Sequence, residues 1–184
     1  ATNWVDAAGL SGKGSTQATE QLRNWKAEST FGYMYTDGSQ ELDLTMRQLG
    51  VSHDTSTPGQ PRNNARAERS NRHVLAGTRN IMLRAGVPTP FWTYAIIYFC
   101  LCHNARDWKV KKSAGTILEP GSSDASKHAY EEVIKPSAWF KRFNKPFRHK
   151  LLPFGCLVDY IPQENDPLSR AKCGGNRAPG VFLG

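Results

Sequence analysis

Two carboxylates stand at positions where α/β folds collect functional groups. The alternating aromatic stretch FGYMYTD predicts a short strand that ends close to Asp37. Glu68 opens the clearest helix of the sequence, directly after a loop that contains Pro and Gly. Two or three such carboxylates can hold a pair of Mg²⁺ or Mn²⁺ ions, which activate a water or a 3′-hydroxyl for displacement at a phosphodiester.

Cations and amides surround Glu68. The stretch STPGQPRNNARAERSNR, residues 56–72, contains four arginines, three asparagines and a single acid. A cluster of arginines this dense can bind the phosphates of DNA, and the asparagines would shape the loop before the helix. The residues expected to contact nucleic acid are Arg62, Asn63, Asn64, Arg66, Arg69, Arg72 and Arg79.

Both carboxylates also have ordinary structural explanations. Glu68 could complement the dipole of its helix and pair with Arg72 one turn later. Asp37 could be a turn residue in the sequence TDGS. The spacing of the two acids alone does not decide between these interpretations and the metal site.

The elements that must position these residues follow from periodicity. Residues 15–28 predict an amphipathic helix, a second helix should end at Gly50, and VSH suggests a brief strand. The helix that contains Glu68 should end at Gly86, and TPFWTYAIIYFCLC should form a helix buried on all sides. The apolar stripe predicted for the Glu68 helix consists of Val74, Leu75, Thr78, Ile81, Met82 and Ala85.

The bulk properties favour a folded, basic protein with an anionic partner. The chain has 184 residues, a formal net charge of +8 and a pI near 9.5. We expect four reduced cysteines and an intracellular setting, with Cys100 and Cys102 as packing residues. The longest apolar run, residues 91–102, is too short to span a bilayer, so no membrane partner is expected.

The second half of the chain has weaker periodicity. Residues 1–108 predict a mixed α/β layer, residues 109–144 a connector and residues 145–184 a small β module. The stretch WFKRFNKPFRHK, residues 139–150, mixes aromatic and basic side chains. It could bind nucleic acid without metal, or it could be a linker whose aromatic rings dock on the core.

Several of these stretches, in this order, resemble retroviral and retrotransposon integrases. The blocks are YTDGSQEL (35–42), GVSHDTSTPGQP (50–61) and NNARAERSNR (63–72). Downstream, FWTYAIIYFCLCHNARD resembles the helix that follows in copia-type elements, while PFGCLVDY and RAPGVFLG resemble their SH3-like module. The resemblance covers roughly residues 30–184. It implies an RNase H-like integrase core followed by an SH3-like β module.

Within that resemblance, Asp37 corresponds to the second catalytic acid and Glu68 to the third, which makes both metal ligands. Asn64 matches the asparagine of the Asn-Gly turn that precedes the third acid in the family. His53 and Ser56 match polar residues of a loop that approaches DNA. The family joins 3′-hydroxyl ends to target phosphodiesters with Mg²⁺ or Mn²⁺. The resemblance therefore implies that DNA is the partner and that copies of the chain associate with one another. It also implies a nuclear location and no small-molecule substrate.

The departures from the family pattern are as informative. Ala65 replaces a glycine before the acid, and only 30 residues separate Asp37 from Glu68, fewer than the family has. Asp6 in NWVDAAGL resembles a residue of the family's second strand rather than its first catalytic acid. We therefore expect the first acid to lie upstream of Ala1, and the core to be truncated and inactive as it stands.

Three other functional classes were weighed. A non-catalytic nucleic-acid-binding remnant of a retrotransposon polyprotein would share the salt-sensitive DNA binding but not the metal-dependent chemistry. A phosphate-binding loop at GLSGKGST fails because Lys13 is followed by Gly14 and the first glycine is too near. A protein-interaction module would have no affinity for DNA, and the number of arginines argues against it.

Overall fold

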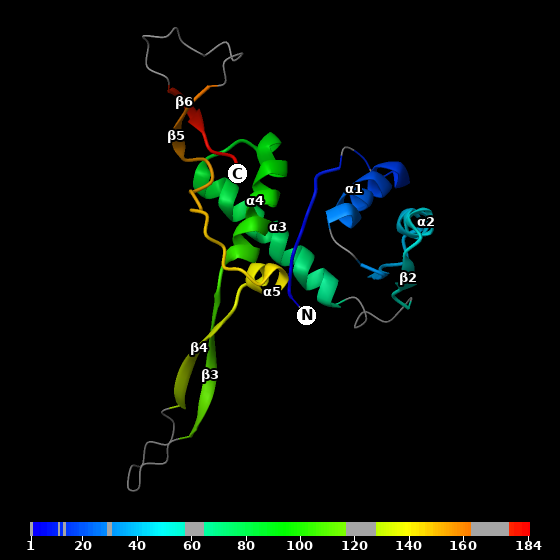
Figure 1. Ribbon diagram of the computed structural model, residues 1–184, viewed down its shortest axis with the longest axis horizontal. Coiled ribbons are helices and arrows are strands. Elements are labelled where there is room, and N and C mark those ends of the chain that lie inside the picture. The colour runs from blue at the N-terminus through cyan, green and yellow to red at the C-terminus, as the bar shows by residue number, and fades with distance from the viewer. Residues whose placement is uncertain are drawn as a thin grey trace. The chain divides into compact units, whose positions relative to one another are not determined.

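The computed structural model describes residues 2–10, 12, 14–28, 31–57, 65–116, 128–162 and 177–184 (Figure 1). The chain divides into two compact units. The larger unit comprises Ala7–Phe99 with Pro153–Gly184, and the smaller unit comprises Ala1–Asp6 with Cys100–Leu152. In the described part of the chain, no helix is long and apolar enough to cross a membrane.

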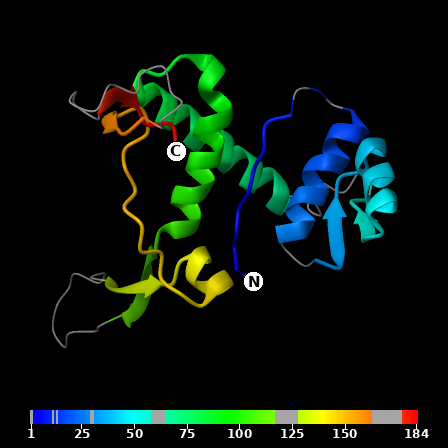
Figure 2. The same ribbon diagram turned by 45° about the horizontal axis from the view of Figure 1, so that its top comes forward.

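The larger unit begins with two helices and two short parallel strands. Helix α1 spans Ser15–Glu28 and strand β1 Tyr33–Thr36, followed by α2 at Gln40–Leu49 and β2 at Ser52–Thr55. Strands β1 and β2 pair in parallel, with Met34 opposite His53. Helices α1 and α2 pack side by side, as both views show (Figures 1 and 2). We call β1, α2 and β2 together the Asp37 region, since β1 ends directly before that residue.

A small core lies between these helices. The side chains of Met46 and Thr45 on α2 are fully buried, and the Thr45 hydroxyl donates to the Glu41 carbonyl at 2.7 Å. On α1, the buried Thr19 hydroxyl lies 3.1 Å from Thr45 Oγ1. Since both hydroxyls have partners, these polar groups are buried without an unpaired donor.

Helix α2 ends where glycine permits the turn. Gly50 has a φ of 60°, in the left-handed region that disfavours residues with a Cβ. The Gly50 N–H donates to the Arg47 carbonyl, and the Val51 N–H donates to the Met46 carbonyl. This is the double hydrogen bond of a Schellman motif, and it sets the course of the chain into β2.

Two long helices follow. Helix α3 spans Ala65–Ala85, a 3-10 turn η2 spans Thr89–Phe91 and α4 spans Trp92–Ala105. Gly77 on α3 lies against the Phe99 ring of α4, and a Cβ at this position would be 2.0 Å from a ring carbon. The absence of a side chain therefore allows these two helices to approach closely.

The carboxyl-terminal part of the larger unit forms a hairpin-like pair of strands. Strand β5, Leu157–Tyr160, pairs antiparallel with β6, Ala178–Val181. The ring centroid of Tyr98 on α4 lies 5.7 Å from those of both Phe154 and Phe182. These aromatic contacts anchor the strand pair on α4.

The smaller unit contains an antiparallel strand pair and a short helix. Strand β3, Trp108–Thr116, pairs with β4, His128–Lys135, and helix α5 spans Ala138–Phe143 (Figure 1). The Trp4 ring packs against Trp139 and Phe143, with the Arg142 guanidinium 4.4 Å from its centroid. These aromatic rings thus pack within the smaller unit, and the docking of residues 139–150 on the core stays a prediction.

Several sequence-based expectations are confirmed, and one is wrong. The helices at 15–28, 40–49 and 65–85 and the strand before Asp37 are present, and Gly50 and Gly86 both have left-handed backbone angles. The helix expected to be buried on all sides is not, because Tyr94 and Ile97 are each 54% exposed. A helix with apolar residues on every side is therefore not necessarily buried on every side. The boundaries drawn at 108 and 144 remain a prediction.

Candidate metal and nucleic-acid site

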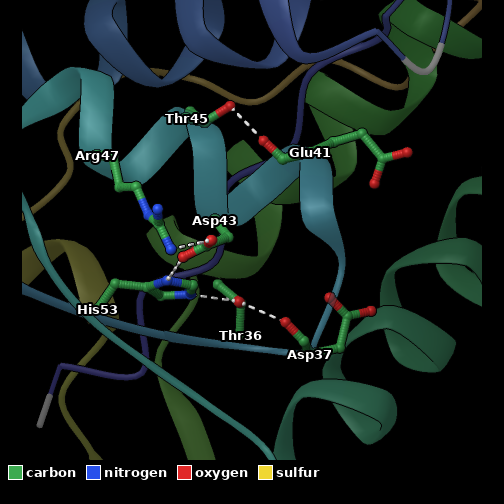
Figure 3. Close-up of polar contacts among 7 residues, drawn as sticks. All are labelled: Thr36, Asp37, Glu41, Asp43, Thr45, Arg47 and His53. Atoms are coloured by element: carbon green, nitrogen blue, oxygen red, sulfur yellow. Dashed lines mark hydrogen bonds and ion pairs between the residues drawn. The ribbon is translucent and has the colours of Figure 1, made fainter.

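Asp37 lies directly after the last residue of β1 and is exposed. Its backbone carbonyl accepts a hydrogen bond of 2.7 Å from the Thr36 hydroxyl. Figure 3 shows that the Asp37 carboxylate points away from His53 and from the hydrogen-bonded side of its own backbone. The carboxylate is thus free of the network that contacts its main chain and faces solvent.

The side chains behind Asp37 form a continuous polar network, which we call the Thr36–His53–Asp43 network (Figure 3). Thr36 Oγ1 lies 2.7 Å from His53 Nε2, and His53 Nδ1 lies 3.6 Å from Asp43 Oδ1. The other Asp43 oxygen pairs with Arg47 at 2.8 Å. The His53 side chain is only 7% exposed, so it faces this network rather than solvent. The His53 side chain thus points into the network, and the approach of its loop to DNA stays a prediction.

Glu68 lies in the first turn of α3 and is exposed. Among the described side chains, Glu68 and Arg72 form no ion pair with each other. The structural explanation in which Glu68 pairs with Arg72 is therefore not realised. A favourable interaction with the amino-terminal end of the helix dipole remains, and it does not compete with ligand binding by an exposed carboxylate.

Four of the predicted nucleic-acid contacts lie on α3. Arg66, Arg69, Arg72 and Arg79 are all exposed. At about 100° per residue, the last three fall within roughly 80° of one another, on the side opposite the buried residues Val74 and Thr78. We call these three side chains the arginine face. Arg62, Asn63 and Asn64 lie outside the described residues.

The donor chemistry fits a divalent cation, but the described residues do not assemble a full site. Carboxylate oxygens are the ligands that Mg²⁺ prefers, and Asp37 and Glu68 both expose theirs. Within the described ranges, no group of three or more His, Cys, Asp or Glu side chains lies together. Asp6 is exposed in a segment without strand structure. Among the described residues, Asp37 and Glu68 are thus two exposed carboxylates of the expected type, and no metal-binding cluster of three such side chains is formed.

Two titratable groups are shifted by their surroundings. A hydrogen bond to Asp54, 2.9 Å from the phenol oxygen, raises the pKa of Tyr33, and burial and the Asp54 charge add to this effect. Burial, with a smaller contribution from the Asp6 charge, raises the pKa of Cys100 to about 11. The Cys100 thiol is therefore protonated at neutral pH and unreactive, in keeping with its expected packing role.

Sequence reasoning missed three members of the network behind Asp37. Thr36, Asp43 and Arg47 were not singled out, although two signals were present. Thr36 alternates with the exposed Tyr33 and Tyr35, which places it on the inner face of β1. Asp43 and Arg47 are spaced four residues apart on one helix, the spacing of a helical ion pair.

Comparison with known proteins gives relatives in sequence and in fold. The chain is 32% identical over 160 residues to the retrovirus-related Pol polyprotein from transposon TNT 1-94 of Nicotiana tabacum, a match that covers 86% of this chain and 10% of that protein. It is also 32% identical over 71 residues, or 37% of its length, to the corresponding polyprotein from transposon RE2 of Arabidopsis thaliana. That match covers 5% of the relative, so the chain spans a small part of each polyprotein. No protein-family model matches.

Among solved structures, the chain resembles one in the cryo-EM structure of the simian T-cell lymphotropic virus intasome in complex with PP2A regulatory subunit B56γ. The TM-score is 0.51 at 14% identity, with 98% of this chain and 58% of that chain covered. The catalytic core domain of BIV integrase gives a TM-score of 0.45 at 14% identity over 57% of this chain and 70% of that one. The chain is therefore a relative of the retrovirus-related Pol polyproteins of plant transposons, and its fold is similar to that of a chain in a retroviral intasome.

Proposed function

We propose that this chain is the DNA-binding part of an integrase core of copia type, which in its complete form joins 3′-hydroxyl ends to target phosphodiesters. The observation that carries the proposal is the pair of exposed carboxylates, one at the end of β1 and one in the first turn of α3. Their order follows the integrase motif blocks in this sequence. The arginine face on α3 supplies the charge that a DNA substrate requires.

Asp37 and Glu68 would hold Mg²⁺ or Mn²⁺. The metal would activate the attacking hydroxyl and stabilise the leaving oxygen of the phosphodiester. The chain's own residues supply the rest: Asp37 and Glu68 bring negative charge to the metal, and the arginines hold the DNA backbone. A complete centre needs a further carboxylate besides Asp37 and Glu68.

The remaining expectations from the integrase resemblance belong to the same proposal. DNA would be the partner, and copies of the chain would assemble on DNA ends in the nucleus. Residues 1–108 would belong to the core, 109–144 to a connector and 145–184 to an SH3-like module. The antiparallel pair β5–β6 lies within the last of these ranges and supports its β character.

A second function has a specific observation in its favour. The described residues contain no cluster of three metal-binding side chains, and Asp6 lies outside any strand. A chain of this kind could bind DNA through its arginines without catalysing strand joining. We therefore carry a non-catalytic nucleic-acid-binding remnant as the alternative.

Strand joining and its reversal on a branched DNA substrate, with Mn²⁺ or Mg²⁺, tests the proposal. The variants are Glu68→Gln, which keeps the shape but removes the charge, and Glu20→Gln, a matched control at an exposed acid of α1. A working metal site predicts a loss of at least about 100-fold for Glu68→Gln and no change for Glu20→Gln. Loss in Asp6→Asn as well would identify Asp6 as the first acid and contradict our assignment.

DNA binding measured on the same preparations separates the two functions. A folded chain that binds DNA with a steep salt dependence but joins no strands at any metal concentration would support the non-catalytic alternative. A folded chain without affinity for DNA at 50 mM salt would contradict both.

A further inference from the structure

The proton positions of the Thr36–His53–Asp43 network follow from its geometry. Thr36 Oγ1 is 2.7 Å from the Asp37 carbonyl oxygen and 2.7 Å from His53 Nε2. A hydroxyl has one proton to donate, and a carbonyl can only accept. When the Thr36 hydroxyl donates to the Asp37 carbonyl, Thr36 Oγ1 can accept from the form of the His53 ring that carries a proton on Nε2.

The His53 ring is held from its other side by α2. Asp43 Oδ1 lies 3.6 Å from His53 Nδ1, and the second Asp43 oxygen is fixed by Arg47 at 2.8 Å. Because the ring is only 7% exposed, solvent cannot replace these partners freely. The ring therefore connects helix α2 to the end of strand β1.

The two peptide groups that flank the Asp37 Cα are both hydrogen-bonded. The Thr36 carbonyl, on one side, accepts from the Ser56 N–H at 2.9 Å. The Asp37 carbonyl, on the other side, accepts from the Thr36 hydroxyl at 2.7 Å. Since peptide groups are planar, fixing both restricts the two backbone dihedrals of Asp37 and hence the direction of its Cα–Cβ bond.

The residue after Asp37 restrains the chain little. The following residue, Gly38, has open space around it, with no heavy atom within 4 Å of a Cβ built at this position. Glycine itself allows the widest range of backbone angles. The hydrogen bonds on the strand side, where Thr36 and His53 lie, therefore contribute directly to the orientation of Asp37.

We propose that Thr36 and His53 are positioning residues for Asp37, holding its backbone so that the carboxylate has one direction. This inference rests on the proposed function, in which Asp37 is a metal ligand. Outer hydrogen-bond partners of metal ligands are commonly worth 10–100-fold in metal affinity (about 10-fold is expected here, since the link is through the backbone).

Two pairs of variants test the network in the metal-free protein. Thr36→Val removes the hydroxyl at constant shape and Thr36→Ser keeps it; His53→Leu removes the Nε2 donor and His53→Gln keeps an amide donor near the same place. The readout is the ¹⁵N order parameter of the Asp37 and Gly38 amides. We expect about 0.85 in the wild type, Thr36→Ser and His53→Gln, and below about 0.6 in the other two. Unchanged order parameters in Thr36→Val and His53→Leu would overturn the proposal.

Mn²⁺ titration of the same proteins adds the metal. Paramagnetic broadening of the Asp37 amide should require about 10-fold more Mn²⁺ in Thr36→Val than in Thr36→Ser. Equal Mn²⁺ affinity in these two variants, despite a difference in order, would reduce the network to a structural role and overturn the proposal. If the wild type shows no broadening at Asp37, the proposed metal ligand fails, while the order parameters still decide whether Thr36 and His53 fix the residue.

A matched measurement excludes a general loss of structure. The thermal midpoint of each variant and the exchange rate of the Met46 amide on α2 should be close to wild type in Thr36→Val. If Thr36→Val unfolds at the working temperature, Thr36→Ser against Thr36→Ala at lower temperature makes the same comparison, because alanine also lacks the hydroxyl. Equal order in that pair would contradict the proposal in the same way.

Discussion

The Asp37 region and the amino-terminal end of α3 present the same chemical group in two different ways. Asp37 follows a paired strand, and hydrogen bonds fix the peptide groups on both sides of it. Glu68 is an exposed side chain on the first turn of a helix, without an ion pair among the described residues. The position of the first carboxylate is set by tertiary contacts, while that of the second is set by helix geometry alone.

This difference indicates that the two carboxylates respond to different changes. The orientation of Asp37 depends on side chains distant in sequence, such as His53. It therefore also depends on the packing of α2 against β1 and β2. Glu68 depends on how far α3 extends toward its amino terminus, where helices fray most easily. Substitutions in the core of each region should therefore separate them.

The largest expected effect is on the core beneath Asp37. Met46→Ala empties a fully buried site on α2 and should lower the free energy of unfolding by about 2–5 kcal/mol. Leu44→Ala, at a side chain that is 50% exposed on the same helix, is the control and should cost much less. Urea denaturation measures both. Equal, small losses would mean that α2 does not support the Asp37 region.

A smaller effect is expected where α3 meets α4. Gly77→Ala would place a Cβ 2.0 Å from the Phe99 ring. Overpacking of this kind costs about 1–3 kcal/mol, and the gain in helix propensity offsets up to about 1 kcal/mol. We expect a net loss of about 1 kcal/mol in thermal or urea unfolding. Asn80→Ala, exposed on the same helix, should be neutral or slightly stabilising, and a stabilised Gly77→Ala would contradict close packing.

The arginine face should act on DNA binding rather than stability. Arg72→Ala should reduce the slope of log K against log salt by about 1, uniformly across DNA sequences, because one phosphate contact is lost. Arg23→Ala removes an exposed arginine of α1 and is the matched control. Fluorescence anisotropy between 50 and 200 mM salt measures the slope. An equal change in both variants would show that only net charge matters.

The smallest effect concerns the outer end of the network. Arg47 pairs with Asp43 one helical turn away, but its side chain is 75% exposed. Arg47→Ala should therefore cost only about 0.3–0.5 kcal/mol, and the difference should vanish in 1 M salt. A loss well above 1 kcal/mol that persists in high salt would mean that His53 and Asp43 depend on Arg47 for their positions.

The sequence specified the local elements well. The spacing of Leu42, Met46 and Leu49 with Gly50 after them predicted α2, and its end is a glycine with a left-handed backbone. The strand before Asp37 was predicted from alternating aromatic residues, and β1 is present at Tyr33–Thr36. Periodicity and helix caps are local properties, so they can be interpreted without knowing the tertiary structure.

The inward orientation of His53 could not be predicted in the same way. Strand β2 has the sequence SHDT, with no alternating apolar residues to identify its buried face. Its partner Asp43 lies ten positions earlier on a helix, and only the pairing of β1 with β2 brings His53 to α2. The exposure of Tyr94 and Ile97 could not be predicted either, because a helix that is apolar on nearly every side contains no pattern of polar residues that would identify its exposed side.

The segment at residues 2–6 shows how one side chain can substitute for a strand. The Val5 N–H donates to Asn104 Oδ1 at 3.0 Å, and Asn104 Nδ2 donates to the Val5 carbonyl at 2.6 Å. A side-chain amide thus offers Val5 the same donor and acceptor that a neighbouring backbone would. Asn104 thus ties the backbone of Val5 to α4, so an Asn104 substitution should speed the exchange of the Val5 amide with solvent.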